Sequence, residues 1–412
     1  MKVYKFGGAS LCDAKGFERV GSIIQANSDP ELVVVVSAIG KTTNHLEKIY
    51  ASIQNGEVPE VSIRQLAQQH EGIALELIKE STVALQKIEA CVQVIREAIH
   101  FDGSPDALYD LIVSQGEILS SVLVHQYLDQ IIPGCRWLDA RSLIVTDERH
   151  REGNVNWPVT ESNIVQALAG QKGIFITQGF IASTVTGKIT TLGRDGSDYS
   201  AAIFASCLKA SNVTIWKDVP GVMNADPKRI TDAVVFPELP YREAAEMTYY
   251  GASVIHPKTI KPLANKNIPL LVKSFVDPEL PGTLIHECRV EKLPPLVVFK
   301  DNQCLISCKG TDYTFITENQ LSDIFRMVSS SGVRINVMQN SAISFSFCID
   351  YRENRVQPLI ERLSRSFEVF YNTGLTLITV KNYTQEIFDQ YRKQSGVLLE
   401  QSSRSTLQIL VR

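Results

Sequence analysis

Short apolar runs alternate with longer amphipathic segments from the first residue to about residue 285. This alternation is typical of a mostly parallel β-sheet with helices packed on both faces. The predicted strands are 3–6, 32–37, 173–179, 213–216 and 269–273, and the predicted helices are 62–79, 82–100, 106–130 and 160–169. Residues 33–36 are four consecutive valines, so we expect their strand to be central and covered on both faces.

The pattern changes after 290–295, where adjacent prolines predict an extended linker. Two further modules follow. The first is predicted as strand 303–309, helix 318–331, strands 333–339 and 343–350, helix 355–366 and strand 367–371. The second is predicted as strand 374–380, helix 384–394 and two strands within 396–411. The order βαββαβ and then βαββ is typical of ferredoxin-like modules. The second module either is abbreviated or shares elements with the first.

The predicted fold class is therefore α/β for residues 1–290, a mostly parallel sheet sandwiched by helices. Two smaller α+β modules are expected at 297–372 and 373–412. A chain of 412 residues is long enough for such a division, because single cores rarely grow so large.

Charge and composition narrow the possible functions. The formal net charge is −4 and no long basic stretch occurs, so we expect no nucleic-acid partner. No apolar run is long enough to span a membrane and the N-terminus lacks a signal-peptide core, so we expect a cytoplasmic protein. The eight cysteines form no zinc-binding spacing, so reduced thiols and no metal site are expected.

The N-terminal strand runs into Lys5-Phe-Gly-Gly-Ala-Ser10. Gly7 and Gly8 let backbone N–H groups approach phosphate oxygens, and Lys5 can neutralise charge on a transferring phosphoryl group. An ordinary turn with a solvated lysine is the alternative explanation. The chain has no Walker-type phosphate loop.

A second glycine-rich turn, residues 193–198, precedes a predicted helix at 199–210. Ser197 or Asp198 is a natural N-cap for this helix. Capping does not account for Arg194, whose planar guanidinium suits a carboxylate.

Three further segments carry candidate binding residues. Ser37 and Thr43 follow the valine strand, at the strand end where open α/β sheets bind ligands. Glu117 lies in a predicted helix with apolar residues on its opposite side. Residues 213–227 begin as a strand and end in turns, with Pro220-Gly221 suited to a type II turn.

Segments 5–10, 191–202 and 216–227 together resemble the amino-acid kinase family and, within it, the aspartate kinases. The resemblance covers essentially the whole chain, and the motifs occur in the family order. It implies the amino-acid kinase fold for the first domain. The C-terminal modules resemble the ACT domains of that family, between which small amino acids bind.

The resemblance implies roles for individual residues. Lys5 and Asp198 are the catalytic pair, with Asp198 orienting Lys5. Arg194 and Ser197 hold the L-aspartate substrate, and Glu117 pairs with its α-ammonium group. The full predicted substrate set is Ser37, Thr43, Glu117, Arg194, Asp195, Gly196 and Ser197. Asp195 stands where the family usually has glycine, and we expect its side chain to point away from the substrate.

The implied nucleotide is ATP with Mg²⁺. The predicted nucleotide-binding residues are Lys5, Phe6, Gly7, Gly8, Ala9, Ser10, Lys217, Asp218, Met223, Lys228, Ser253 and Val254. Ser253 replaces a lysine of the familiar bacterial pattern, and Lys217 or Lys258 is expected to offset that loss. A carboxylate acceptor is already ionised at neutral pH, so no general base is required.

The predicted reaction is transfer of the ATP γ-phosphoryl group to L-aspartate, giving 4-phospho-L-aspartate for lysine, threonine and methionine synthesis. Two alternatives remain open: a catalytically silent amino-acid sensor, and a kinase for another amino acid such as glutamate. Substitutions such as Ala9 and Met223 favour the sensor, whereas retention of the catalytic pair argues against it.

Regulation is less constrained by the sequence. Asn336 stands where an acidic residue is common, and Ala342 where lysine-sensitive members tend to have glutamate. A cationic effector loses two partners by these exchanges, so inhibition by lysine is not expected, and either threonine or no effector is expected instead. A homodimer or higher homo-oligomer is expected from the family.

Overall fold

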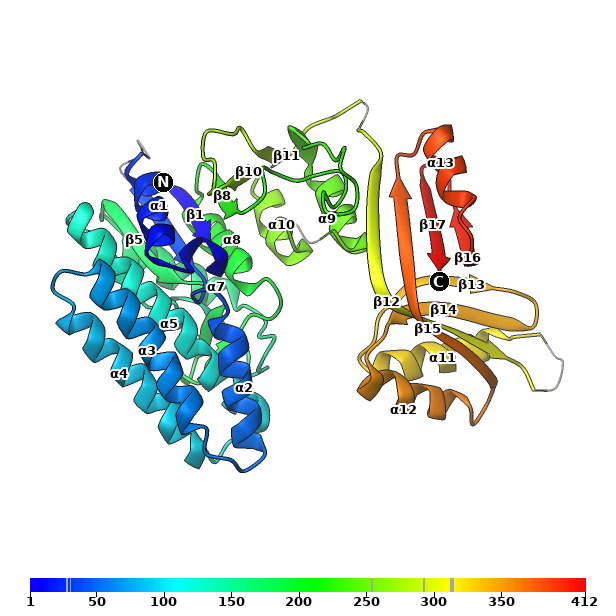
Figure 1. Cartoon of the computed structure of the whole chain (residues 1–412), viewed down its shortest axis with the longest axis horizontal. Helices are drawn as coiled ribbons and strands as arrows, with labels where there is room; N and C mark the ends of the chain where they lie inside the picture. The colour runs from blue at the N-terminus through cyan, green and yellow to red at the C-terminus, as the bar shows by residue number, and fades with distance from the viewer. Residues whose placement is uncertain (27–28, 30, 253–254, 292, 312–314) are drawn as a thin grey trace. The chain divides into compact units, whose positions relative to one another are not determined.

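The computed structural model describes residues 1–26, 29, 31–252, 255–291, 293–311 and 315–412. The chain divides into two compact units. The first unit comprises 1–222, 235–245 and 253–290, and the second comprises 223–234, 246–252 and 291–412. Figure 1 labels the helices and strands of both units.

An eight-stranded sheet forms the centre of the first unit, in the order β3-β5-β2-β1-β8-β10-β11-β9. The six strands from β3 to β10 are parallel, β11 runs antiparallel to β10, and β9 is parallel to β11. Their bounds are β1 Lys2–Phe6, β2 Glu31–Val36, β3 Arg136–Leu138, β5 Gly173–Gln178, β8 Val213–Lys217, β9 Glu238–Pro240, β10 Leu270–Ser274 and β11 Thr283–His286. The predicted mostly parallel sheet is thus confirmed.

The valine strand has the burial that its sequence predicts. Residues 32–36 of β2 are all fully buried, because β2 lies between β1 and β5 and is covered on both faces. A small sheet in the order β4-β6-β7 lies in the same unit, formed by β4 Val145–Thr146, β6 Ile181–Thr184 and β7 Ile189–Thr191.

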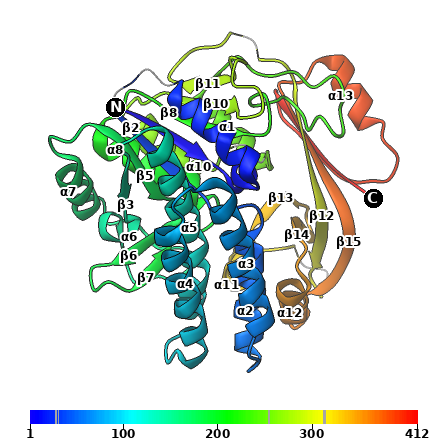
Figure 2. The same cartoon turned by 60° about the vertical axis from the view of Figure 1, so that its left-hand side comes forward.

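Helices α2 to α5 pack against one another, and Figure 2 shows them side by side. The helices of the first unit are η1 Gly8–Leu11, α1 Ala14–Gln25, α2 Thr42–Gln54, α3 Glu60–Leu77, α4 Thr82–Glu97, η2 Ala98–His100, α5 Pro105–Ile131, α6 Ala140–Leu143, α7 Trp157–Leu168, α8 Gly196–Leu208 and α10 Pro257–Ala264. Helix α9, Tyr241–Tyr250, begins in the first unit and ends in the second.

Helix α5 is the core helix of the first unit. It begins with Ser104 as N-cap and Pro105 in its first turn, a favourable start for a helix. Within the described part of the chain it is the one helix long and apolar enough to cross a membrane, but 83% of its most apolar stretch is buried in protein. Its apolar residues therefore belong to the core.

The strand order places a binding site at β1. β2 lies on one side of β1 and β8 on the other, so the chain changes direction across the sheet at this strand. In open α/β sheets, ligands bind beyond the carboxyl ends of the strands at such a switch point. Gly8 and Ser37 follow β1 and β2, and Lys217 is the last residue of β8, so all three lie at this edge.

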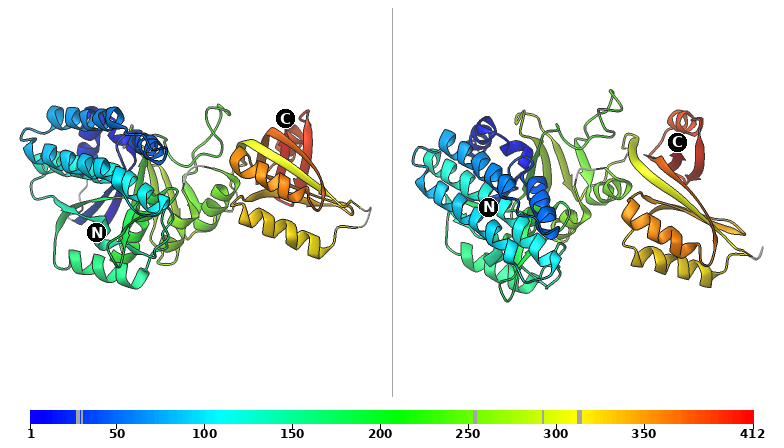
Figure 3. Two further views of the ribbon diagram at one scale, coloured as in Figure 1. Left: turned by 90° about the horizontal axis from the view of Figure 1, so that it is seen from below. Right: turned by 60° about the horizontal axis from the view of Figure 1, so that its bottom comes forward.

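The second unit contains a six-stranded antiparallel sheet in the order β13-β14-β12-β15-β17-β16. Figure 3 shows α11 and α12 running beside this sheet. The elements are β12 Leu296–Lys309, α11 Glu318–Ser330, β13 Ile335–Asn340, β14 Ser344–Asp350, α12 Glu353–Leu363, β15 Glu368–Lys381, α13 Gln385–Arg392, β16 Val397–Ser402 and β17 Thr406–Val411.

Two long strands resolve the question that the sequence left open about the second module. Residues 303–309 of β12 pair with β14 and β15 in the first half of the sheet, whereas residues 296–300 pair with the end of β15. β15 itself passes without interruption through residue 372, where the sequence pattern predicted two strands. The two ferredoxin-like halves therefore share β12 and β15.

Candidate active site

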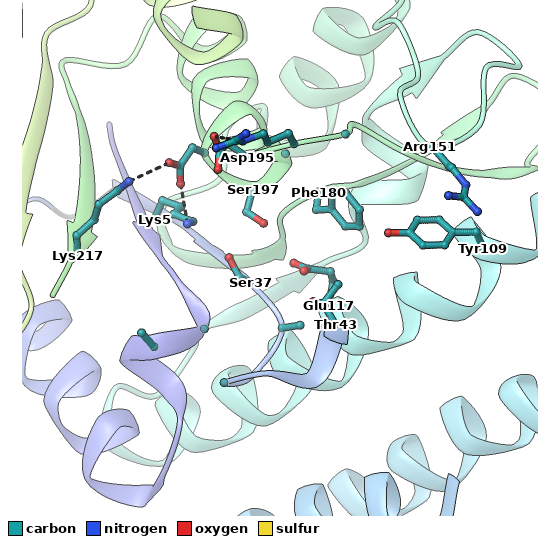
Figure 4. A pocket seen from close by; sticks show the side chains of 18 residues that line it. Lys5, Ser37, Thr43, Tyr109, Glu117, Arg151, Phe180, Asp195, Ser197 and Lys217 are labelled. Carbon is teal, nitrogen blue, oxygen red and sulfur yellow. Dashed lines mark ion pairs between the residues drawn. The ribbon is translucent and has the colours of Figure 1, made fainter. Parts of the chain in front are cut away.

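A cavity of about 550 Å³ opens at the carboxyl ends of the parallel strands in the first unit. Figure 4 shows side chains from several elements facing it. The predicted residues that line it are Lys5, Gly8, Ala9, Ser37, Thr43, Glu117, Arg194, Asp195, Gly196, Ser197, Asp198 and Lys217. Lys5, Asp198 and Lys217 each come from a different one of the three motifs, so the fold brings these separate segments together in one cavity.

Asp198 lies between two lysines at the floor of the cavity. Its Oδ1 is 2.6 Å from Nζ of Lys5, and its Oδ2 is 3.8 Å from Nζ of Lys217 (Figure 4). Lys5 and Asp198 are both buried, and Asp198 is in the first turn of α8. The pair therefore holds the ammonium group of Lys5 in a fixed position.

Glu117 is a buried acid that its surroundings satisfy only in part. It is 3% exposed, and its Oε2 has no hydrogen-bond partner among the described residues. Burial raises the pKa of Glu117 to about 8, although the Ala38 N–H, the charge of Lys5 and the Ser197 hydroxyl all favour the ionised carboxylate. An external cation beside Oε2 would supply the missing partner.

Close backbone contacts explain one glycine of the first motif. A Cβ on Gly8 would lie 2.4 Å from the carbonyl oxygen of Ala38 and 2.8 Å from that of Gly40. The Gly40 N–H donates to the Gly8 carbonyl over 3.0 Å, so the loops after β1 and β2 are joined here. Glycine at position 8 thus permits the two loops to form one wall of the cavity.

Arg194 and Asp195 lie together at the rim. The Arg194 side chain is 77% exposed, and its Nε is 3.8 Å from Oδ2 of Asp195. Asp195 has a φ of 53°, in the left-handed region where glycine is unstrained and aspartate is tolerated. Asp195 thus lines the cavity beside Arg194, and the orientation of its side chain away from the substrate stays a prediction.

Several predicted nucleotide residues do not line this cavity. Phe6 is fully buried and stacks on Trp216, the Ser10 hydroxyl donates to the Gly7 carbonyl, and Asp218 is exposed. Lys258 forms an ion pair with Glu152 instead.

The remaining predicted nucleotide residues fall elsewhere in the chain. Met223 and Lys228 belong to the second unit. Their segment packs there, with Ala225 in an apolar cluster that contains Val297 and Val380. Ser253 and Val254 lie outside the described residues.

Sequence reasoning missed a second arginine at the cavity, Arg151. Its guanidinium lies 4.0 Å from the centre of the Tyr109 ring, and its Nε is 2.6 Å from Oδ1 of Asp106 (Figure 4). The other missed lining residues are Ala38, Gly40, Tyr109, Phe180 and Gly193. Tyr109 precedes Glu117 by two helical turns, so the periodicity of α5 could have indicated it.

A buried carboxylate fixes the loop that carries Arg151. The Arg151 N–H donates to Asp110 Oδ2 over 2.9 Å, the Thr191 hydroxyl donates to Oδ1 over 2.7 Å, and His150 Nδ1 lies 2.9 Å from Oδ2. Burial raises the pKa of Asp110, and these contacts partly oppose the shift. Arg151 itself has a φ of 63°, which is uncommon for a residue with a side chain.

The charges in the cavity form a pattern suited to a small zwitterion with extra negative charge. Lys5 and Lys217 lie around Asp198, Arg194 and Arg151 lie at the rim, and Glu117 is the buried acid. No serine, cysteine or histidine here is arranged as a covalent nucleophile with its base among the described lining residues. The arrangement can bind anions and an ammonium group together.

Comparisons with known proteins agree with this geometry. The family model described as "Amino acid kinase family" matches residues 1–274. Lysine-sensitive aspartokinase 3 of Escherichia coli is 32% identical, over 92% of this chain and 86% of its own length. A bifunctional aspartokinase/homoserine dehydrogenase of Buchnera aphidicola is 31% identical over 91% of this chain, which spans 47% of that longer relative.

A solved structure gives the same result. The crystal structure of E. coli aspartokinase III in complex with aspartate and ADP has a TM-score of 0.86 and 27% identity, covering 100% of this chain and 96% of that one. The predicted resemblance is confirmed by sequence and by fold. The chain therefore belongs to the amino acid kinase family, among the aspartokinases.

Proposed function

We propose that this protein is an ATP-dependent kinase that phosphorylates the side-chain carboxylate of L-aspartate. The product is 4-phospho-L-aspartate, the first intermediate toward lysine, threonine and methionine. Residues 1–290 form the catalytic domain in this proposal. Residues 297–412 form the regulatory region, in which the predicted modules 297–372 and 373–412 share β12 and β15. The E. coli relative whose solved complex contains aspartate and ADP supports both substrates.

The observation that carries the proposal is Glu117, a buried acid with an unpartnered oxygen in a cavity that Lys5 and Arg194 also line. Its unpartnered Oε2 is buried beside Lys5, Ser37 and Ser197 (Figure 4). An α-ammonium group supplies the missing charge, while Arg194 at the rim takes the α-carboxylate. A substrate held at both ends in this way leaves its side-chain carboxylate to attack.

The nucleotide is assigned to the lysine side of the cavity. Lys5 and Lys217 offer positive charge next to exposed backbone at Gly8 and Ala9, which suits polyphosphate oxygens. Asp198 is already shared by the two lysines, so Mg²⁺ would be held mainly by the phosphates themselves. The metal would neutralise charge on the γ-phosphoryl group.

Catalysis in this site rests on orientation and charge. Asp198 fixes the Lys5 ammonium where negative charge develops during transfer. No proton has to leave the attacking carboxylate, which explains why the cavity needs no general base. Thr43 and Ser197 are assigned to hydrogen bonds with the substrate.

We also propose that the second unit does not recognise a lysine effector. Lys300, Gln303, Asn336 and Asp350 form one polar cluster there, the Lys300 cluster. Nζ of Lys300 is 3.0 Å from Asp350 Oδ1 and donates to Asn336 Oδ1 over 2.8 Å. An internal ammonium group thus already uses these acceptors. Titrating turnover with lysine and with threonine tests this, and strong inhibition by lysine contradicts it.

The decisive experiment is ATP-dependent formation of aspartyl hydroxamate. The purified protein is expected to turn over aspartate, whereas Lys5→Ala lowers kcat by roughly 100- to 1,000-fold, the usual cost of one preorganised transition-state donor. Lys2→Ala, at the other end of the same strand, is the matched control and keeps activity.

The alternative functions give different results. A protein that binds aspartate but never forms hydroxamate is the amino-acid sensor. Hydroxamate formed with glutamate in preference to aspartate identifies the other amino-acid kinase. Either result, or normal turnover in Lys5→Ala, contradicts the proposed function.

A further inference from the structure

Three metal-ligand side chains cluster at one edge of the first unit, and none of them lines the active-site cavity. They are Glu238, His286 and Cys288. Their ligand atoms all lie within 4.8 Å of one another. Nε2 of His286 is 2.5 Å from Oε1 of Glu238.

Strand geometry brings these residues to one face. β9 is the edge strand and pairs in parallel with β11, so that Glu238 lies opposite Leu284. Leu239 and Ile285 are fully buried, and the alternation of a strand turns their neighbours Glu238 and His286 to the other face. Cys288 lies two residues beyond the end of β11, and its Sγ lies within 4.8 Å of the ligand atoms of the other two residues.

The ligand set has a definite chemical preference. A thiolate, an imidazole and a carboxylate are the three donor types that zinc accepts in proteins. Mg²⁺ and Ca²⁺ prefer oxygen ligands alone, so a thiol and an imidazole in the set select against them.

Exposure at the cluster also suits a bound ion. The side chains of His286 and Glu238 are 29% and 45% exposed, and Cys288 is partly exposed. A metal reaching these three ligands would therefore have solvent access for water in the fourth position. Glu238 contacts both of the other side chains directly: its Oε1 lies 2.5 Å from Nε2 of His286, and it hydrogen-bonds with the Cys288 thiol.

We propose that Glu238, His286 and Cys288 bind one Zn²⁺ ion at the edge of the sheet. The ion links β9 to β11 and to the segment that follows β11. It lies outside the phosphoryl-transfer site, so the inference does not depend on the proposed kinase activity.

Cobalt substitution tests the site directly in the full chain. One equivalent of Co²⁺ added to metal-free protein is expected to give a thiolate-to-cobalt charge-transfer band and tetrahedral d–d bands. Zn²⁺ should abolish both bands by displacement. Cys288→Ser should remove the charge-transfer band. His286→Ala should weaken Co²⁺ binding by at least roughly tenfold, because loss of a residue that only supports a metal ligand already costs that much.

Controls separate this site from binding to other thiols and imidazoles. Cys12→Ser and His100→Ala change exposed residues elsewhere in the first unit and should keep both bands. Zn²⁺ should also raise the thermal unfolding midpoint of the unchanged protein but not of Cys288→Ser. Absence of the charge-transfer band, or its persistence in Cys288→Ser, overturns the proposal.

Discussion

Two polar clusters, one in each unit, differ in how fully their hydrogen bonds are satisfied. In the Lys300 cluster, Asp350 accepts from Gln303 and Asn336, each over 2.9 Å, and pairs with Lys300. Burial alone would raise the pKa of Asp350, but these partners outweigh it and lower the pKa. In the cavity, Glu117 keeps an orphan oxygen and a raised pKa. A closed network stabilises its own fold, whereas an unsatisfied one is ready for a ligand.

Removing the charge of Glu117 is the strongest test of this contrast. A hydrogen bond to a charged group contributes about 1.5–3 kcal/mol, so Glu117→Gln should raise the KM for aspartate roughly 10- to 150-fold. Hydroxamate kinetics measure the change, with the exposed Glu97→Gln on α4 as control. An unchanged KM would remove Glu117 from the ammonium site.

The same variant should be more stable than the original protein in mild alkali. The folded pKa of Glu117 is about 8 against an ordinary value of 4.5, so the folded state holds a proton that the unfolded state has lost. Stability from this group is therefore lost as pH rises from 4.5 through 8. At pH 8.5 Glu117→Gln should melt higher, by about 1–2 °C for each kcal/mol recovered in a chain of this size. An equal or lower midpoint contradicts the raised pKa.

Aspartate affinity should itself depend on pH. The ammonium group needs the ionised form of Glu117, whose pKa is about 8. Binding then tightens as pH rises, by about tenfold per unit well below that pKa, and levels off above it. Calorimetric titration between pH 6.5 and 8.5 measures the trend and the proton released on binding. A flat profile would mean that Glu117 is already ionised in the free protein.

Arg151 should have a smaller effect because it already has partners. A partly exposed ion pair is worth about 1 kcal/mol at most, so Arg151→Ala should raise the KM for aspartate by up to about fivefold. Arg151→Lys keeps the charge but loses the planar contact with Tyr109, so its KM for aspartate should lie between that of the original protein and that of Arg151→Ala. Arg149→Ala, exposed in the same loop, is the control. A loss of kcat alone would point to a different role.

Asp195 should oppose substrate binding slightly. Two unit charges 4 Å apart interact by about 1 kcal/mol in water, so freeing Arg194 by Asp195→Gly should lower the KM for aspartate by up to about fivefold. Glycine also accepts the left-handed conformation at this position. A higher KM would show instead that Asp195 assists binding.

The Lys300 cluster should leave aspartate binding unchanged. Lys300→Met leaves Asp350 and Asn336 short of a partner, and because this ion pair is partly exposed the protein should lose about 1 kcal/mol of stability at most. Denaturant unfolding measures that loss, and hydroxamate kinetics should show the original KM for aspartate. A shifted KM would break the contrast between a closed network and an open one.

The sequence predicted the parts of the site that lie in compact motifs. Lys5, Arg194 and Asp198 lie in or next to turns that require glycine, and those glycines can be recognised in the sequence. Arg151 has no such pattern, because it is placed by a buried contact with Asp110, 41 residues away. Sequence analysis missed the cluster of Glu238, His286 and Cys288 for the same reason, because Glu238 and His286 are 48 residues apart in the chain.

The fold was predicted well where hydrophobic periodicity is strong, and less well at one turn signal. Asn372-Thr-Gly374 reads as a turn, so two strands were predicted there. Gly374 does have a φ of 69°, but β15 continues through it. The register between β12 and β15 shifts close by, at Gln303. Pairing with β12 on both sides outweighs the local preference for a turn.

The unbroken course of β12 and β15 limits how this protein can be shortened. A chain ending at residue 372 would lose the segment that pairs with residues 296–300, and would leave that stretch as a bare strand edge. Such an edge recruits other chains, so the truncated protein should aggregate rather than yield a trimmed enzyme. Residues 296–412 are in this sense indivisible, because neither half of the sheet keeps its strand partners without the other.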